Sequence, residues 1–241
     1  MLGLGNSISH ASPIRLTPTD VSGLMVWLQN GVGITSSGSP AVIDVWADSS
    51  GNGNDATTTG GTRPYLVDGG GEWEGDSDAD TLALDSELTL AQFHIFVVVA
   101  ADETSTNTIV AGNSTQDFIR IGQSANNKAH RMKANGAATT PADYIATTAV
   151  ATDGTKQLLE YELSSGSSNN SFLRINGSLE ATVSHDGSSN ALDIGFVGAT
   201  NSSGGSSFNG KIYEVLIYNT ALSSSQASDI RSHINDRLNI Y

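Results

Sequence analysis

Short apolar runs alternate with clusters of Gly, Ser, Asn and Asp along most of the chain. The runs are rich in β-branched and aromatic residues, which is typical of strands bounded by turns. Strands in this number and spacing predict an all-β sandwich or jelly roll. The predicted strands are Gly23–Gln29, Val42–Trp46, Thr81–Leu84, His94–Ala101, Thr108–Ala111, Phe118–Gly122, Ala129–Ala134, Tyr144–Ala149, Gln157–Leu163, Phe172–Asn176, Leu179–Ser184, Leu192–Val197 and Lys211–Tyr218.

Asn176-Gly177 gives the strongest turn signal. The pair separates the apolar segments Phe172–Ile175 and Leu179–Val183. Both central residues of a type I′ turn need a positive φ, and Asn-Gly accepts that conformation readily. The sequence therefore predicts a tight hairpin at this point.

One segment near the C-terminus has helical rather than strand periodicity. Ser223 and Gln226 fit a capping box, in which the two side chains bond the first free N–H groups of a helix. Ala227, Ile230, Ile234 and Leu238 then fall on one helical face. These features predict a short amphipathic helix over Ser224–Leu238 that packs onto the sheet through that face.

Residues 1–20 differ from the rest because they lack a sustained apolar period. Pro13 and Pro18 indicate an extended arm, followed by one domain over residues 21–241. An attachment arm and a frayed terminus both fit this segment. The first positive charge is Arg15 and the early apolar residues are interrupted, so no cleaved signal peptide is expected. The longest apolar run, Ile95–Ala101, is too short to span a bilayer.

The chain is acidic, with a formal net charge of −14. A surface of that sign repels phosphate backbones and anionic lipids, so neither nucleic acid nor membrane is an expected partner. Cysteine is absent, which excludes disulfides, thiolate metal sites and cysteine nucleophiles. No histidine has a partner at metal-ligand or catalytic spacing, and His94 is expected to be a packed or surface residue.

Three stretches resemble the concanavalin A-like jelly-roll superfamily, and within it the laminin G-like branch. They are Val45–Ala56, with its Trp, Asp and Ser-Gly-Asn-Gly turn, Trp73–Val99, and Phe208–Leu222 with the capped helix after it. Arg174–Gly177 resembles the late hairpin of the family. The resemblance implies a jelly-roll sandwich of two antiparallel sheets with a short C-terminal helix. It indicates the fold more than the function, because lectins, glucanases and adhesive modules share it.

The opening MLGLGNSIS is similar to the start of virion proteins of tailed phages. This resemblance implies a structural virion protein, as a capsid decoration or fibre, that assembles in the host cytoplasm. Its partners would be other virion proteins, bound through residues 1–20, and we expect a homo-oligomer. The alternative is a carbohydrate-binding adhesion module, with calcium as a candidate cofactor and host-surface glycans as ligands, and a glycoside hydrolase ranks after it.

Alternating acids form the first candidate site: Glu72, Glu74, Asp76, Asp78 and Asp80. Glucanases of this superfamily place acids on alternating positions of one strand, and a retaining pair lies about 5 Å apart. Here no aliphatic residues alternate with the acids, so an exposed acidic loop without catalytic activity is expected. Asp76, Asp78 and Asp80 are candidate calcium ligands, because calcium prefers clustered carboxylates.

Asp48, Asn52 and Asn54 form a second oxygen-rich segment, with Asp55 beside them. These side chains suit calcium or sugar hydroxyls, and they equally suit a tight turn in which Asp48 bonds its own backbone. Trp73, which two acids flank, is the best candidate for an exposed sugar-stacking ring. Packing within a turn is the alternative for that residue.

Overall fold

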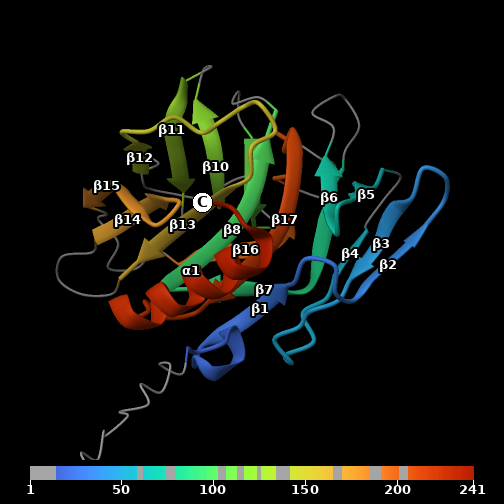
Figure 1. Ribbon diagram of the computed structural model, residues 1–241, viewed down its shortest axis with the longest axis horizontal. Coiled ribbons are helices and arrows are strands. Elements are labelled where there is room, and N and C mark those ends of the chain that lie inside the picture. The colour runs from blue at the N-terminus through green and yellow to red at the C-terminus, as the bar shows by residue number, and fades with distance from the viewer. Residues whose placement is uncertain are drawn as a thin grey trace, which may run out of the picture.

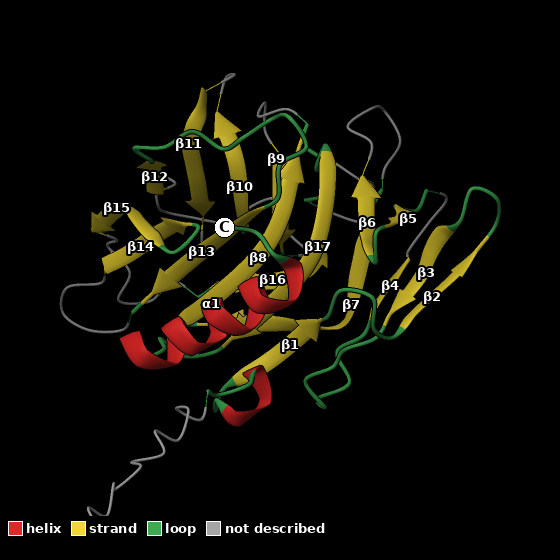
Figure 2. Ribbon diagram, in the orientation of Figure 1, coloured by secondary structure: helices red, strands yellow, loops and turns green. Residues whose placement is uncertain are grey.

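The computed structural model describes residues 15–58, 62–73, 80–102, 107–112, 117–123, 126–133, 142–164, 170–184, 191–200 and 206–241 (Figure 1). This part of the chain is almost entirely antiparallel β-structure, with an α-helix close to its C-terminal end (Figure 2). It contains no helix with the length and hydropathy that a membrane crossing requires. The predicted all-β class is confirmed.

The strands form two layers. The order in the first layer is β15–β14–β13–β8–β17, and both β1 and β6 pair with the free side of β17. Its strands are β1 (Leu24–Leu28), β6 (Gly70–Trp73), β8 (Phe93–Ala101), β13 (Gln157–Leu163), β14 (Asn170–Ile175), β15 (Ser178–Ser184) and β17 (Gly210–Tyr218).

The order in the second layer is β12–β11–β10–β9–β16–β7–β4–β3–β2. A short strand, β5 (Tyr65–Val67), pairs with both β3 and β6 and so joins the layers at one edge. The second layer contains β2 (Ile34–Ser37), β3 (Val42–Trp46), β4 (Ala56–Thr58), β7 (Leu82–Leu90), β9 (Asn107–Ala111), β10 (Phe118–Gln123), β11 (Asn126–Lys133), β12 (Ala142–Ile145) and β16 (Leu192–Val197).

Strand β8 lies in the middle of the first layer and is buried on both faces. Alternate side chains of a strand point to opposite faces. Ile95, Val97 and Val99 therefore enter the core between the layers. Phe96 and Val98 enter a second apolar cluster on the outer face of the layer. A strand buried on both faces explains the unbroken apolar run in the sequence.

Helix α1 (Ser224–Leu238) covers the second cluster (Figure 1). Its N-cap is Ser223, which forms the predicted capping box with Gln226. Ile230 and Ile234 are fully buried against the sheet, and Leu238 is partly buried at the edge of the same cluster. The prediction of an amphipathic helix that packs onto the sheet is confirmed, and it closes the outer face over β17 and β8.

Residues 15–20, the last part of the predicted arm, pack against the domain. Pro18 is buried at the start of a 3-10 turn, Pro18–Asp20, and its carbonyl accepts a hydrogen bond of 3.1 Å from the Tyr218 hydroxyl. Arg15 forms an exposed ion pair of 2.6 Å with Asp236 of α1. Residues 1–14 lie outside the described residues, so attachment through residues 1–20 stays a prediction.

Candidate functional site

Charged side chains gather on the outer face of the first layer, where α1 meets β13. Glu160 and Glu162 are two positions apart on β13 and so point to the same face. The strand register places His94 of β8 beside Glu162 on one side and Arg174 of β14 beside Glu160 on the other. The antiparallel pairing of three strands therefore brings two acids, a histidine and an arginine together.

Helix α1 adds a second arginine from above. Arg231 lies one residue after the buried Ile230, and its Nη1 donates to both carboxylate oxygens of Glu160 at 2.8 Å. Glu160 also accepts a bond of 2.6 Å from Nε2 of His94. The Nδ1 atom of His94 accepts from the Leu222 amide at 3.4 Å, so Nε2 is the ring nitrogen that donates to Glu160. His94 is therefore a buried residue that orients Glu160.

Glu160 is almost completely buried, with 1% of its side chain exposed. Burial alone raises the pKa of a carboxyl, because it disfavours the charged form. The interactions with His94, followed by those with Arg231, outweigh burial, so the pKa of Glu160 lies below its ordinary value. Glu160 is ionised at neutral pH and is the fixed, buried centre of this charged cluster.

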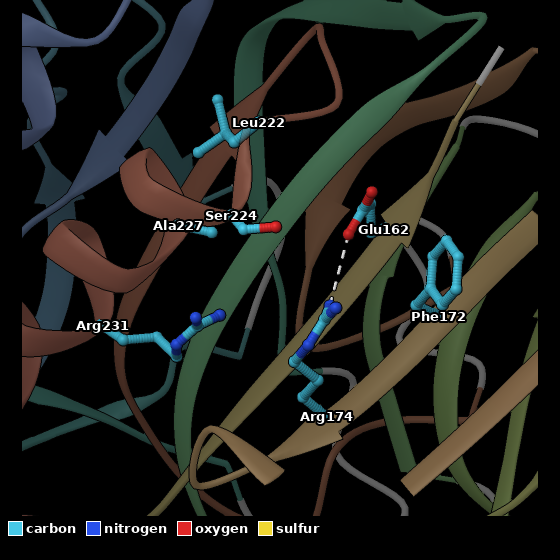
Figure 3. A pocket seen from close by; sticks show the side chains of 7 residues that line it. All are labelled: Glu162, Phe172, Arg174, Leu222, Ser224, Ala227 and Arg231. Atoms are coloured by element: carbon cyan, nitrogen blue, oxygen red, sulfur yellow. Dashed lines mark hydrogen bonds and ion pairs between the residues drawn. The ribbon is translucent and has the colours of Figure 1, made fainter. Parts of the chain in front are cut away.

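A pocket of about 210 Å³ opens beside Glu160, between the start of α1 and strands β13 and β14 (Figure 3). Glu162 and Arg174 form an ion pair of 3.2 Å in its wall. The complete lining is Glu162, Phe172, Arg174, Leu222, Ser224, Ala227 and Arg231. The pocket therefore has charged and apolar groups on both sides: Glu162, Arg174 and Phe172 come from the sheet, and Arg231, Ser224 and Ala227 come from the helix.

The arginines and glutamates of the pocket hold each other in place. Arg174 also lies 3.5 Å from Glu160, so it contacts both acids. Its guanidinium carbon lies 5.7 Å from the centre of the Phe172 ring, within the range of a cation–π contact. Such paired groups present fixed N–H donors and carboxylate acceptors next to an aromatic ring. This set suits a small polar ligand that both donates and accepts hydrogen bonds.

The second oxygen-rich segment serves the backbone. Both oxygens of Asp48 accept hydrogen bonds, Oδ1 from the amides of Trp27 and Ser50 and Oδ2 from the hydroxyl of Ser50 and the amide of Asn54. The side-chain amides of Asn52 and Asn54 donate to carbonyls of β1. Among the described strands, none pairs with this side of β1, which forms only an isolated bridge between Leu28 and Asp48. The turn therefore covers an open sheet edge, and ligand binding there stays a prediction.

We expect the Asp48→Ala variant to lose about 2 kcal/mol of unfolding free energy, because it leaves amides of β1 and of the turn without their acceptor. Urea unfolding of both proteins measures this difference, and the exposed Asp85→Ala variant is the control. If EDTA lowers the melting temperature of the wild type but not of the variant, Asp48 holds a metal ion instead.

Trp73 is completely buried, so the expectation of an exposed ring is wrong. Its ring fits against glycines of β6 and of the turn after β16. A Cβ atom on Gly198 would lie 2.0 Å from Nε1 of Trp73, and one on Gly71 would lie 2.5 Å from the six-membered ring. The missing side chains of these glycines create the room for the tryptophan. Trp73 is therefore a packed residue of the core, whereas the sequence had offered an exposed ring or packing within a turn.

Most of the acidic run lies outside the described residues. The candidate calcium ligands Asp76 and Asp78 belong to this part that is not described. Asp80 is described and is buried, with 4% of its surface exposed. Glu72 on β6 pairs with Lys211 of β17 at 3.3 Å. Among the described residues, no three His, Asp or Glu side chains are arranged to hold a metal ion. Calcium binding stays a prediction.

The pocket was not among the sites predicted from the sequence, although the sequence carried a signal for it. Glu160 and Glu162 are alternating acids within an otherwise apolar predicted strand, which marks one face of that strand as charged. His94 similarly interrupts the start of the most apolar strand. Arg231 carried no signal, because a charged residue on an amphipathic helix is ordinary.

No protein-family model matches the chain. No curated protein matches it either. Solved structures do match, and the fold is the basis of their similarity. Domain 4 of AbnA, a GH43 extracellular arabinanase from Geobacillus stearothermophilus in complex with arabinotriose, gives a TM-score of 0.64 at 18% identity, covering 86% of this chain and 97% of that chain.

Two larger proteins also contain a similar fold. The sialidase of Trypanosoma rangeli in complex with sialic acid gives a TM-score of 0.56 at 16% identity, covering 90% of this chain and 34% of that chain. The binding domain of botulinum neurotoxin DC in complex with rat synaptotagmin II gives 0.54 at 13% identity, covering 90% and 51%. The chain thus spans about a third of the sialidase and half of the neurotoxin domain, and these likenesses establish the sandwich fold.

Proposed function

We propose that the protein is a non-catalytic carbohydrate-binding module and that the pocket between α1, β13 and β14 is its binding site. The observation that carries this proposal is the lining of the pocket, where the Glu162–Arg174 ion pair lies beside Phe172 and the helix-borne Arg231. The fold supports it, because nearly the whole of an arabinanase domain in complex with arabinotriose has the same fold.

Sugars match the chemistry of this lining. Each sugar hydroxyl donates and accepts hydrogen bonds, and the Glu162–Arg174 pair offers an acceptor and several donors side by side. Phe172 and Leu222 provide apolar surface for the C–H face of a sugar ring. Because the ion pairs already fix the arginines, binding immobilises few additional side-chain rotamers.

The same geometry argues against hydrolysis. A glycosidase needs one carboxyl that is protonated near neutral pH, together with a second that is charged. Glu160 has a lowered pKa and is bonded to Arg231 and His94. Glu162 is paired with Arg174. Both acids are therefore ion-paired, and Glu160 lacks the unpaired, apolar environment that raises the pKa of a general acid.

The test compares two tryptophan substitutions on the same exposed turn of α1. Ser224 lines the pocket, and its neighbour Ser225 does not. A glycan array followed by calorimetry on the full chain should identify a neutral oligosaccharide ligand. Ser224→Trp should weaken that binding by at least tenfold, about 1.4 kcal/mol, whereas Ser225→Trp should leave it unchanged.

Equal affinities of the two variants would place the binding site elsewhere, and an array with no bound glycan would contradict the proposed function itself. Release of reducing sugar from arabinan or from the bound glycan would contradict the non-catalytic part. Circular dichroism and thermal melting of both variants confirm that each one folds.

The structural virion role stays a prediction. It rests on the first nine residues, and these lie outside the described residues. None of the three solved structures named above is a virion protein. Display of a glycan-binding module on a particle that attaches to a host surface is consistent with both the virion role and the proposed function.

A further inference from the structure

We infer that the pocket takes a single neutral sugar unit at the end of a glycan chain, rather than an internal stretch of chain or an acidic sugar. This inference rests on the proposed function and narrows its ligand class. Three properties of the site carry it: the volume of the pocket, the position of α1, and the balance of charge in the lining.

The volume limits the ligand. The pocket has a volume of about 210 Å³. Sites for drug-sized ligands begin at about 300 Å³. One sugar ring suits this space, and a row of several rings does not.

Helix α1 closes the direction in which a longer chain would continue. An open sheet face lets a polysaccharide lie across its strands. Here α1 packs on β8 and β17 through Ile230 and Ile234, so the outer face is covered directly beside the pocket (Figures 1 and 3). Leu222 and Ala227 form the wall on that side. A ligand therefore enters from the exposed side and ends against this wall.

Each arginine at the pocket already has a carboxylate partner. Arg174 is paired with Glu162, and Arg231 is paired with Glu160 beneath the pocket. A sugar carboxylate entering this site would find no arginine free of a carboxylate, and it would lie beside Glu162. Like charges in a partly buried site are unfavourable, so the lining selects against acidic sugars.

Two of the backbone amides at the start of α1 are used within the helix itself. The capping box uses the Ser223 hydroxyl to accept from the Gln226 amide at 3.3 Å. The Ala227 amide donates to the Ser223 carbonyl at 2.9 Å. These N–H groups at the start of α1 already have acceptors. The polar and aromatic groups that line the pocket are the Glu162–Arg174 pair, Arg231, the ring of Phe172 and Ser224.

Calorimetry on the full chain tests the inference with two ligand series. The first compares methyl glycosides of arabinose, glucose and galactose with the methyl uronides of glucose and galactose. The second is a set of oligosaccharides of the best neutral sugar, from one to five units. We expect the uronides to bind at least tenfold more weakly than their neutral counterparts. We expect the Kd to change by less than about threefold along the length series.

The Glu162→Gln variant provides a charge-specific readout. It removes one negative charge and gives the pocket a net positive charge, so the ratio of uronide to neutral affinity should rise by about tenfold. Ser225→Trp, which is outside the pocket, should keep the wild-type ratio. A change in overall stability alone would not move this ratio between two ligands of the same size.

Each outcome is decisive. Uronides that bind the wild type as tightly as neutral glycosides would overturn the inference, as would an affinity that rises tenfold or more with each added unit. Either result would leave a carbohydrate-binding function intact. Failure of every glycan to bind would instead overturn the proposed function, and the inference with it.

Discussion

Replacing Arg237 by alanine should reduce the free energy of unfolding by about 3–5 kcal/mol, because the change leaves a buried carboxylate without its partner. Glu214 of β17 is fully buried beneath α1. Nη1 of Arg237 donates to both of its oxygens at 2.8 Å, and the indole N–H of Trp27 donates to one of them at 2.8 Å. This cluster fastens the last turns of the helix to the sheet.

Urea unfolding at neutral pH measures the effect, and Arg15→Ala is the matched control. Arg15 also pairs with an acid of the helix–sheet unit, but both partners are more than half exposed, and such pairs contribute about 0–1 kcal/mol. Adding Glu214→Gln to Arg237→Ala should recover part of the loss, because a neutral amide costs less to bury than a carboxylate. An Arg237→Ala variant as stable as the Arg15→Ala control would show that the helix does not depend on this pair.

The Arg237→Ala loss should also depend on pH. Burial already raises the pKa of Glu214, and the charge of Arg237 and the bond from Trp27 lower it again in part. Without Arg237 the folded-state pKa rises further above the unfolded value. A carboxyl with a raised folded pKa stabilises the fold below the unfolded pKa and loses that contribution as pH rises. The difference in unfolding free energy between the wild type and Arg237→Ala should therefore be smaller at acidic pH than at neutral pH.

The parts of the fold that local physics decides were predictable from the sequence. Asn176 and Gly177 both have positive φ, 51° and 78°, at the turn between β14 and β15, as the predicted hairpin requires. The capping box fixed the start of α1. The strand predicted over Thr81–Leu84 was too short, because the structure extends β7 to Leu90 through three exposed polar residues that carry no apolar alternation.

Elements whose partners lie far away in the chain were not predictable in the same way. The strand β2 has the sequence Ile34-Thr-Ser-Ser37, is mostly exposed, and forms because β3 offers it a free edge. Trp73 looked exposed because acids flank it in sequence. It is buried because Gly198, more than a hundred residues later, lies against its ring. Local composition does not contain such information.

The pocket shows the same limit for function. The alternation of Glu160 and Glu162 was visible, and it implied a shared face. The pairing of β13 with β8 decides which layer this face belongs to. The packing of α1 decides which part of the face is covered. Arg231 enters the site from 71 residues away. A sequence pattern shows which residues of one strand share a face. A binding pocket also needs residues from a second element that packs beside that strand.

The buried His130 should make the protein lose stability in mild acid. His130 of β11 lies in the interior, where Nδ1 is 2.7 Å from the hydroxyl of Tyr161 on the facing layer. Burial lowers its pKa to about 3, against 6.5 for an exposed histidine. Below about pH 6.5, His130 therefore becomes protonated in the unfolded chain but stays unprotonated in the folded protein. Stability then falls as the pH falls from 6.5 toward 3.

At about 1.4 kcal/mol per pH unit, this difference in protonation lowers the free energy of unfolding by roughly 3 kcal/mol at about pH 4.5. Unfolding free energies of the wild type and of His130→Phe, each measured near pH 7 and near pH 4.5, isolate the contribution. The change with pH should be smaller in the variant by about this amount, whatever its absolute stability. His233→Gln is the control. That histidine is only half-buried, and burial and Arg237 lower its pKa, so its removal should alter the pH dependence less. Parallel pH profiles for the wild type and His130→Phe would show that His130 becomes protonated within the folded sandwich.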